Sequence, residues 1–106
     1  MSENLTEENF ARNLNTKFRV RAEAPRPVEL ELVEVKGWRT RPEEEQGMER
    51  FTLLFLGPGD IFMPQQTYTL EHESMGVFDI FIVPVGQDER GFKYQAVFNY
   101  FKDSNK

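Results

Sequence analysis

His72 is the only histidine in the chain, and two acids, Glu71 and Glu73, flank it. An imidazole beside carboxylates is a combination that serves metal binding and general acid–base catalysis. The surrounding pattern predicts a strand, however, and a strand directs Glu71 and Glu73 to the face opposite His72. His72 instead shares a face with Tyr68 and Leu70, so we expect a buried, hydrogen-bonded structural histidine with a lowered pKa. One histidine also cannot build a multi-histidine zinc site.

Two carboxylates form the second candidate site. If the strands before and after the turn at residues 74–76 pair so that their numbers sum to 150, Glu71 lies opposite Asp79. Facing carboxylates repel, and one of them gains a raised pKa unless the pair shares a cation such as calcium or magnesium. Two carboxylates fall short of a full coordination shell, and both can also point into water. Glu71 and Asp79 are therefore weak candidates for a metal site.

No set of residues predicts a reaction. Ser74 has no base and orienting acid placed beside it, and no nucleophile elbow surrounds it. The segment Gly57-Pro58-Gly59 lacks the lysine and the helix of a phosphate-binding loop. The chain contains no cysteine, which excludes a thiol nucleophile, a disulfide and a thiolate zinc site. We therefore expect a protein that is not an enzyme and that carries no cofactor.

Composition and charge limit the kinds of partner that the chain is expected to bind. The 106 residues are enough for one domain, and the net charge of −5 argues against nucleic-acid binding. No apolar run is long enough to span a membrane and no signal peptide is apparent, so we expect a cytoplasmic protein. Residues 12–41 carry eight Lys/Arg and four acids, whereas residues 51–89 carry six acids and no Lys or Arg. This asymmetry predicts either a basic hairpin beside its own acidic strands or a bipolar surface that binds a partner.

The elements that position these residues are mostly strands. Ten phenylalanines, three tyrosines and one tryptophan suit pleated, half-buried surfaces. The expected elements, in a single domain over residues 1–106, are a helix over 6–14 and strands over 17–23, 28–36, 49–56, 66–73, 77–84 and 92–100. We expect a mainly β fold with one short N-terminal helix and about six antiparallel strands, arranged as a small barrel or a two-layer sandwich.

The sequence predicts a specific strand register for each of two hairpins. In the first hairpin, one register pairs apolar residues with apolar residues and basic residues with acids. In this register the numbers of paired residues sum to 50, which places Arg19 opposite Glu31 and Arg21 opposite Glu29. The phase of the apolar pattern then slips near Leu32 and Val33, which predicts a β-bulge. In the second hairpin, a three-residue loop over 74–76 requires a left-handed last residue, and Gly76 supplies it. Pro84 is expected to end the following strand or to lie on an unpaired edge.

Several segments together resemble a family of short bacterial proteins classed as a domain of unknown function. The matching segments are Phe51-x-Leu53-x-Phe55-x-Gly57-Pro58, Pro64-Gln65-x-Thr67-Tyr68-x-Leu70-Glu71-His72, Val83-Pro84-Val85-Gly86 and Ala96-Val97-Phe98-Asn99. The resemblance implies no reaction and no cofactor. It associates the family with gene neighbourhoods that hold phage tail-collar-type genes, and so implies a subunit of a larger, phage tail-like assembly.

The segment from Gly57 to Gln66 is the candidate contact surface. Ile61, Phe62 and Met63 are consecutive apolar residues in an expected loop, so they cannot all point into one core. We expect Phe62 to plug the end of the barrel, and Ile61 or Met63 to contact another protein chain or a second copy. Two hypotheses follow: a non-catalytic interaction or structural module, or a small barrel that binds a small ligand or a cation.

Overall fold

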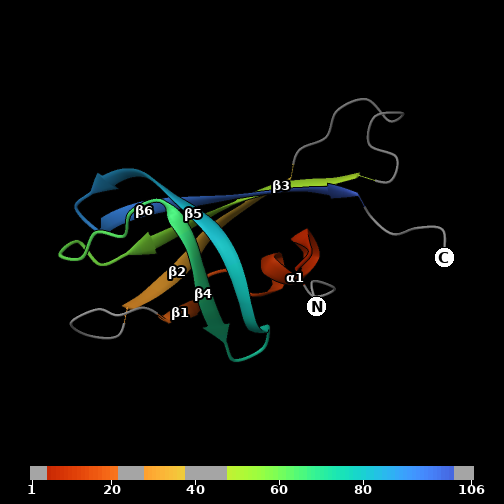
Figure 1. The fold of residues 1–106 in the computed structure, drawn as a ribbon, viewed down its shortest axis with the longest axis horizontal. Coiled ribbons are helices and arrows are strands. Elements are labelled where there is room, and N and C mark those ends of the chain that lie inside the picture. The colour runs from red at the N-terminus through yellow and green to blue at the C-terminus, as the bar shows by residue number, and fades with distance from the viewer. Residues whose placement is uncertain (1–4, 22–27, 38–47, 102–106) are drawn as a thin grey trace.

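The computed structural model describes residues 5–21, 28–37 and 48–101 (Figure 1). One helix, α1 (Glu7–Arg12), precedes six strands. The strands are β1 (Lys17–Arg21), β2 (Val28–Gly37), β3 (Met48–Gly57), β4 (Gln66–His72), β5 (Gly76–Asp88) and β6 (Gly91–Phe101). No helix in the described part of the chain is long and apolar enough to cross a membrane.

The strands form one closed antiparallel barrel. Their order around the barrel is β1-β2-β3-β6-β5-β4, and β4 closes it by pairing with β1. Strand β4 thus returns to lie beside β1 of the β1–β2–β3 meander, which is a Greek-key connection. The structure confirms the mainly β class and selects the barrel over the sandwich.

Two bulges bend the barrel strands. The β2–β3 register shifts between Leu32 and Glu34, which confirms the bulge predicted there. A second shift falls in β5 between Pro84 and Gly86. The prediction that Pro84 ends its strand or lies on an unpaired edge is wrong, because β5 continues to Asp88 and Pro84 pairs with Tyr94. A bulge is one of the few places in a sheet that accommodates proline.

The predicted register of the first hairpin is displaced by two residues. Arg19 lies opposite Glu29, not Glu31, and Lys17 takes the place opposite Glu31. Arg21 forms an ion pair with Glu71 of the neighbouring strand β4. A two-residue displacement leaves every side chain on the same face, so neither the apolar nor the charged pattern distinguishes the two registers. The intervening segment, residues 22–27, lies outside the described residues.

The second hairpin is displaced in the same way. His72 pairs with Gly76, so the three-residue loop is Glu73–Met75 instead of residues 74–76. Gly76 has a φ of 83°, as predicted, but it is the first residue of β5 and follows the loop. As a consequence, Asp79 lies opposite Thr69, and Glu71 lies opposite Val77.

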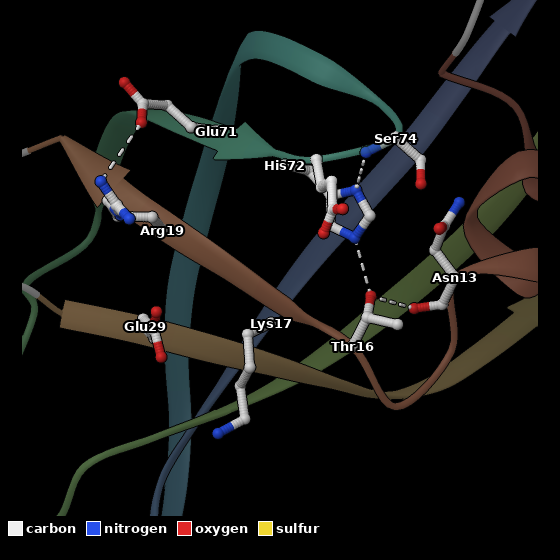
Figure 2. Close-up of a pocket in the computed structure, with 9 residues that line it drawn as sticks. Asn13, Thr16, Lys17, Arg19, Glu29, Glu71, His72 and Ser74 are labelled. Atoms are coloured by element: carbon white, nitrogen blue, oxygen red, sulfur yellow. Dashed lines mark hydrogen bonds and ion pairs between the residues drawn. The ribbon is translucent and has the colours of Figure 1, made fainter.

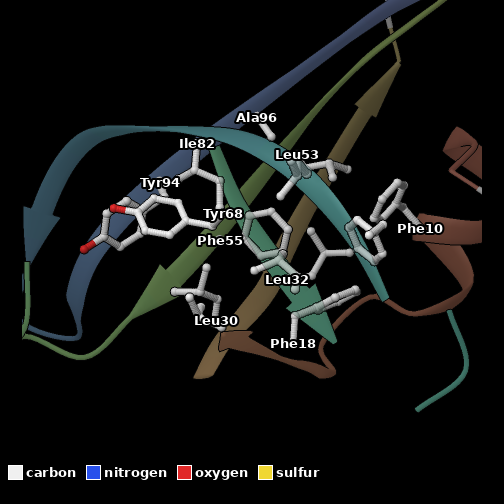
Figure 3. Close-up of a cluster of buried hydrophobic side chains, with 14 of the residues drawn as sticks. Phe10, Phe18, Leu30, Leu32, Leu53, Phe55, Tyr68, Ile82, Tyr94 and Ala96 are labelled. Atoms are coloured by element: carbon white, nitrogen blue, oxygen red, sulfur yellow. The ribbon is translucent and has the colours of Figure 1, made fainter. Parts of the chain in front are cut away.

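The barrel interior is filled with apolar side chains from every strand (Figure 3). Phe10 of α1 closes one end, since its ring lies 5.5–6.3 Å from the rings of Phe18, Phe51, Phe78 and Phe98. These four rings belong to β1, β3, β5 and β6. The short helix therefore ties together strands from opposite sides of the barrel.

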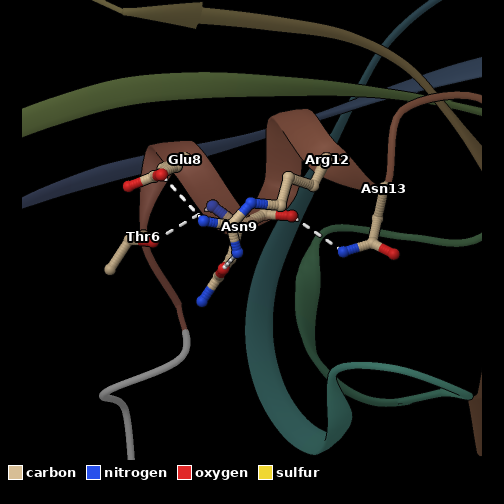
Figure 4. Close-up of polar contacts among 5 residues, drawn as sticks. All are labelled: Thr6, Glu8, Asn9, Arg12 and Asn13. Carbon is tan, nitrogen blue, oxygen red and sulfur yellow. Dashed lines mark hydrogen bonds and ion pairs between the residues drawn. The ribbon is translucent and has the colours of Figure 1, made fainter.

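Local interactions start α1 where the sequence predicts, but the helix ends at Arg12, two residues before the predicted end at residue 14 (Figure 4). The side chain of Thr6 caps the helix by accepting a hydrogen bond from the backbone N–H of Asn9 at 3.1 Å. Arg12 donates to Glu8 one turn earlier at 2.7 Å. Asn13 is the C-cap, so Leu14 does not extend the apolar stripe begun by Phe10, and it is exposed.

Candidate functional site

His72 lies where β4 enters its turn, and both of its ring nitrogens are hydrogen-bonded (Figure 2). Nδ1 accepts the backbone N–H groups of Ser74 at 2.9 Å and of Met75 at 3.2 Å. Nε2 lies 2.8 Å from the hydroxyl of Thr16, which itself donates to the carbonyl of Asn13 at 2.6 Å. The ring therefore connects the β4–β5 turn to the segment that joins α1 to β1.

These bonds define the proton arrangement at His72. Backbone N–H groups can only donate, so Nδ1 carries no proton and the neutral ring holds its proton on Nε2. That proton points to the oxygen of Thr16, whose own hydrogen is committed to Asn13. Both ring nitrogens are therefore engaged in hydrogen bonds within the chain. The hydroxyl of Ser74 takes no part, since Ser74 contacts the ring through its backbone.

The environment of the ring is half-buried, not buried as the sequence predicts. The ring of Phe18 packs against it with a centroid distance of 4.2 Å. Burial lowers the pKa of His72, while the charge of Glu73 acts in the opposite direction and is the smaller influence. The lowered direction agrees with the prediction.

An open pocket of about 560 Å³ lies beside His72. Its charged lining mixes two cations with three carboxylates, from Lys17, Arg19, Glu29, Glu71 and Glu73. This mixture offers no single sign of charge for an ionic ligand to recognise. The pocket also lies outside the barrel wall, and not in its interior.

The titration of His72 gives a prediction with a definite sign. Burial disfavours the charged ring, and a proton on Nδ1 would also face two N–H donors, so the folded chain binds this proton less readily than the unfolded chain does. We expect a midpoint below the ordinary 6.5 in an NMR titration, where the sole histidine gives one set of ring signals. Stability is then fully present above about pH 6.5 and falls as the pH decreases towards the folded-state pKa.

The variant His72→Asn is the matched control. Its side-chain oxygen replaces Nδ1 as the acceptor for the turn but does not titrate in this range. We expect the decrease in melting midpoint between about pH 7 and pH 5.5 to be smaller in this variant. A ring midpoint at or above 6.5, or an unchanged pH dependence in His72→Asn, would contradict the assignment.

The proposed carboxylate pair does not exist, because the register separates its members. Glu71 forms ion pairs with Arg21 and, at 4.0 Å, with Arg19, both on β1. Asp79 accepts a hydrogen bond from the hydroxyl of Thr69 at 2.6 Å. Among the described residues, no group of three or more His, Asp or Glu side chains could hold a metal ion. The ion pairs of Glu71 also show the basic first strand lying beside an acidic partner strand.

The loop from Gly57 to Gln66 reverses the predicted roles of its apolar residues. Met63 is buried in the core, and Ile61 packs against the core. Phe62 is 56% exposed and lies against Phe92, with ring centroids 5.3 Å apart. Met63 thus takes the buried position predicted for Phe62, and Phe62 takes the exposed position predicted for Ile61 or Met63.

Two tyrosines hold this loop over the second end of the barrel. The hydroxyl of Tyr94 accepts the N–H of Met63 at 2.9 Å and donates to the carbonyl of Ile61 at 3.5 Å. The hydroxyl of Tyr68 donates to the carbonyl of Pro64 at 2.6 Å. Burial raises the pKa of both phenols, so both stay protonated as these bonds require.

Four further exposed apolar side chains lie elsewhere, on the outside of β5 and β6. We call this the outer apolar face. Its apolar side chains are between 50% and 65% exposed; they are Val77, Phe81, Val85 and Val97. Across the strands, uncharged Thr67 lies opposite Phe81 and Gln95 lies opposite Val83, whereas the acid Glu71 lies opposite Val77.

The sequence carried a signal for this face. From residue 76 to 86 the only charged residue is Asp79, so β5 is apolar on both of its faces. A strand in the wall of a small barrel has one face towards solvent, and the second apolar set must therefore be exposed. The contact predicted from the sequence lies instead in the loop from Gly57 to Gln66.

Comparison with known proteins identifies a family and no individual relative. Residues 5–98 match a family described as a domain of unknown function (DUF6916). No curated protein and no solved structure matches the chain.

Proposed function

We propose that this chain, which belongs to the DUF6916 family of domains of unknown function, is a non-catalytic interaction module that binds other protein subunits through the outer apolar face. The resemblance noted from the sequence extends the proposal to its setting, a larger assembly of the phage tail-like kind. The partner surface that fits is apolar and uncharged.

The observation that carries the proposal is the exposure of Phe81, which is 51% accessible in the middle of β5. Val77 and Val85 are exposed along the same strand and Val97 on β6, and Asp79 is the only acid among the outward residues of this part of β5. Apolar side chains exposed in this way favour a protein contact site. Large aromatic side chains contribute most of the binding free energy at such sites.

The other groups considered have local partners that account for them. His72 is used on both ring nitrogens, and Glu71 is held by arginines of β1. The barrel interior is filled by its own side chains, which favours binding on the outside over binding of a small ligand within. These points support an interaction module over the small-ligand alternative.

The test compares two exposed phenylalanines. A tagged chain is produced in its native cell, and its size is measured by sedimentation of the gently lysed extract. We expect the chain to sediment in a complex much larger than its own 12.5 kDa. Phe81→Ser should return it to the monomer position with little loss of stability, because an exposed side chain adds little to folding. Phe62→Ser is the control and should leave the complex intact.

Two results would contradict the proposal. One is a wild-type chain that sediments as a free monomer. The other is a complex that survives Phe81→Ser but dissociates with Phe62→Ser, which would return the contact to the loop over the barrel end.

A further inference from the structure

Strand β6 has one edge that no described strand completes along its second half. It pairs with β3 over its whole length, from Gly57↔Phe92 to Met48↔Phe101. It pairs with β5 only as far as Gln95, opposite Val83. Figure 1 shows β3 and β6 running on together, beyond the point where β5 bends away. From Ala96 onwards, the edge of β6 remote from β3 therefore has no partner among the described strands.

The chemistry of this segment favours strand pairing. Residues 95–101, Gln-Ala-Val-Phe-Asn-Tyr-Phe, contain no charge, no glycine and no proline. Natural sheet edges are usually protected against pairing by lysine, proline or a bulge, and this edge has none of these between Gln95 and Phe101. Uncharged segments of six or seven residues with high β-propensity are those that pair with copies of themselves.

The segment is also held ready for pairing. The ring of Phe98 stacks on Phe51 of β3 at 4.7 Å with an interplanar angle of 7°, and Phe10 packs on Phe98 at 5.5 Å. Val97 points to the opposite face and, at 65%, is the most exposed of the large hydrophobic side chains described. Anchoring from one side fixes the strand in its extended form, which lowers the entropy cost of adding a strand.

We propose that the free edge of β6, residues 96–101, pairs antiparallel with the same edge of a second copy about a two-fold axis. The occupant is a second copy because each copy supplies the same unpaired edge. Each chain carries a net charge of −5, so copies repel wherever charged surfaces meet, and this edge is free of charge. The product is one continuous four-stranded sheet, in which β3-β6 of one copy is followed by β6-β3 of the other. It replaces two separate two-stranded ribbons, which are only marginally stable.

This inference rests on the proposed function, since it names one partner of the interaction module. Its test uses two valines that are similarly exposed, Val97 at 65% and Val85 at 50%. The dissociation constant of the purified chain is measured by sedimentation equilibrium up to millimolar concentration. We expect a dimer that Val97→Lys weakens by about tenfold or more, because like charges meet across the axis. Val85→Lys should leave the constant within about twofold.

A cysteine experiment makes the result independent of how Val97→Lys folds. The chain has no cysteine, so Val97→Cys introduces a single thiol per copy. A short bifunctional maleimide should link two copies of Val97→Cys and should not link two copies of Val85→Cys.

The outcomes separate this inference from the proposed function. A chain that stays monomeric at millimolar concentration, or a Val97→Cys chain that does not cross-link, overturns the β6 pairing while leaving the Phe81 test untouched. A dimer that Val85→Lys breaks and Val97→Lys does not also overturns the pairing, and it assigns self-association to β5. Loss of the dimer in Val97→Lys alone, with cross-linking at position 97, establishes the pairing.

Discussion

Replacing Phe10 by alanine should destabilise this barrel by about 3–5 kcal/mol. The side chain is fully buried and its ring contacts four other aromatic rings from four strands. Removing it opens a cavity at the end of the barrel where β5 has left β6, and none of the described strands is positioned to fill the space. For a domain of this size, the loss corresponds to a decrease of at least about 12 °C in melting midpoint.

The matched control for this prediction is Phe62→Ala. It removes the same atoms from a side chain that is 56% exposed and rests on Phe92. We expect a loss below about 1 kcal/mol, measured like Phe10→Ala by chemical denaturation. Equal effects of the two substitutions would show that α1 does not close the barrel.

Replacing Gly91 by alanine should strongly destabilise the protein. Gly91 begins β6 with a φ of 146°, a conformation that residues with a Cβ atom rarely adopt. An added Cβ would lie 2.0 Å from the carbonyl oxygen of Gly57, so the backbone of β3 or of the turn must move. We expect a loss of roughly 3 kcal/mol or more, from strain and steric overlap together.

Gly86→Ala is the control for this second prediction. Gly86 also lies near this end of the barrel, but an added Cβ meets nothing within 4 Å and its φ is ordinary. Its stability in urea should stay within about 0.5 kcal/mol of the wild type. A Gly91→Ala chain as stable as Gly86→Ala would refute the close approach of β3 and β6 at this point.

The sequence was sufficient for the element types but not for the registers. Alternation fixed which side chains of β1 face inwards, and Phe18 and Val20 are indeed buried. The registers failed by two residues in both hairpins, because a two-residue displacement preserves both faces. In the second hairpin the deciding interaction was local: the ring of His72 binds the amides of Ser74 and Met75, so the turn begins one residue earlier than the glycine alone indicates.

The contact surface was harder to predict than the core. Met63 and Phe62 are adjacent in a segment without a repeating pattern, so nothing in the sequence decides which of them is buried. The choice depends on the hydroxyl of Tyr94, which lies 31 positions away in the chain and binds the backbone of Met63. The exposure of Phe81 was easier to foresee, since a strand that is apolar on both faces leaves one apolar face outside a closed barrel.

Side-chain footprinting with hydroxyl radicals determines whether the outer apolar face of β5 and β6 is the surface that binds the partner. The isolated chain is compared with the chain in the complex recovered from its native cell. Phe81 and Phe62 are similarly exposed, at 51% and 56%, and so should be oxidised to a similar extent in the isolated chain. We predict that assembly protects Phe81 strongly and leaves Phe62 reactive. Protection of Phe62 with Phe81 still reactive would contradict the assignment of the binding surface to the outer apolar face.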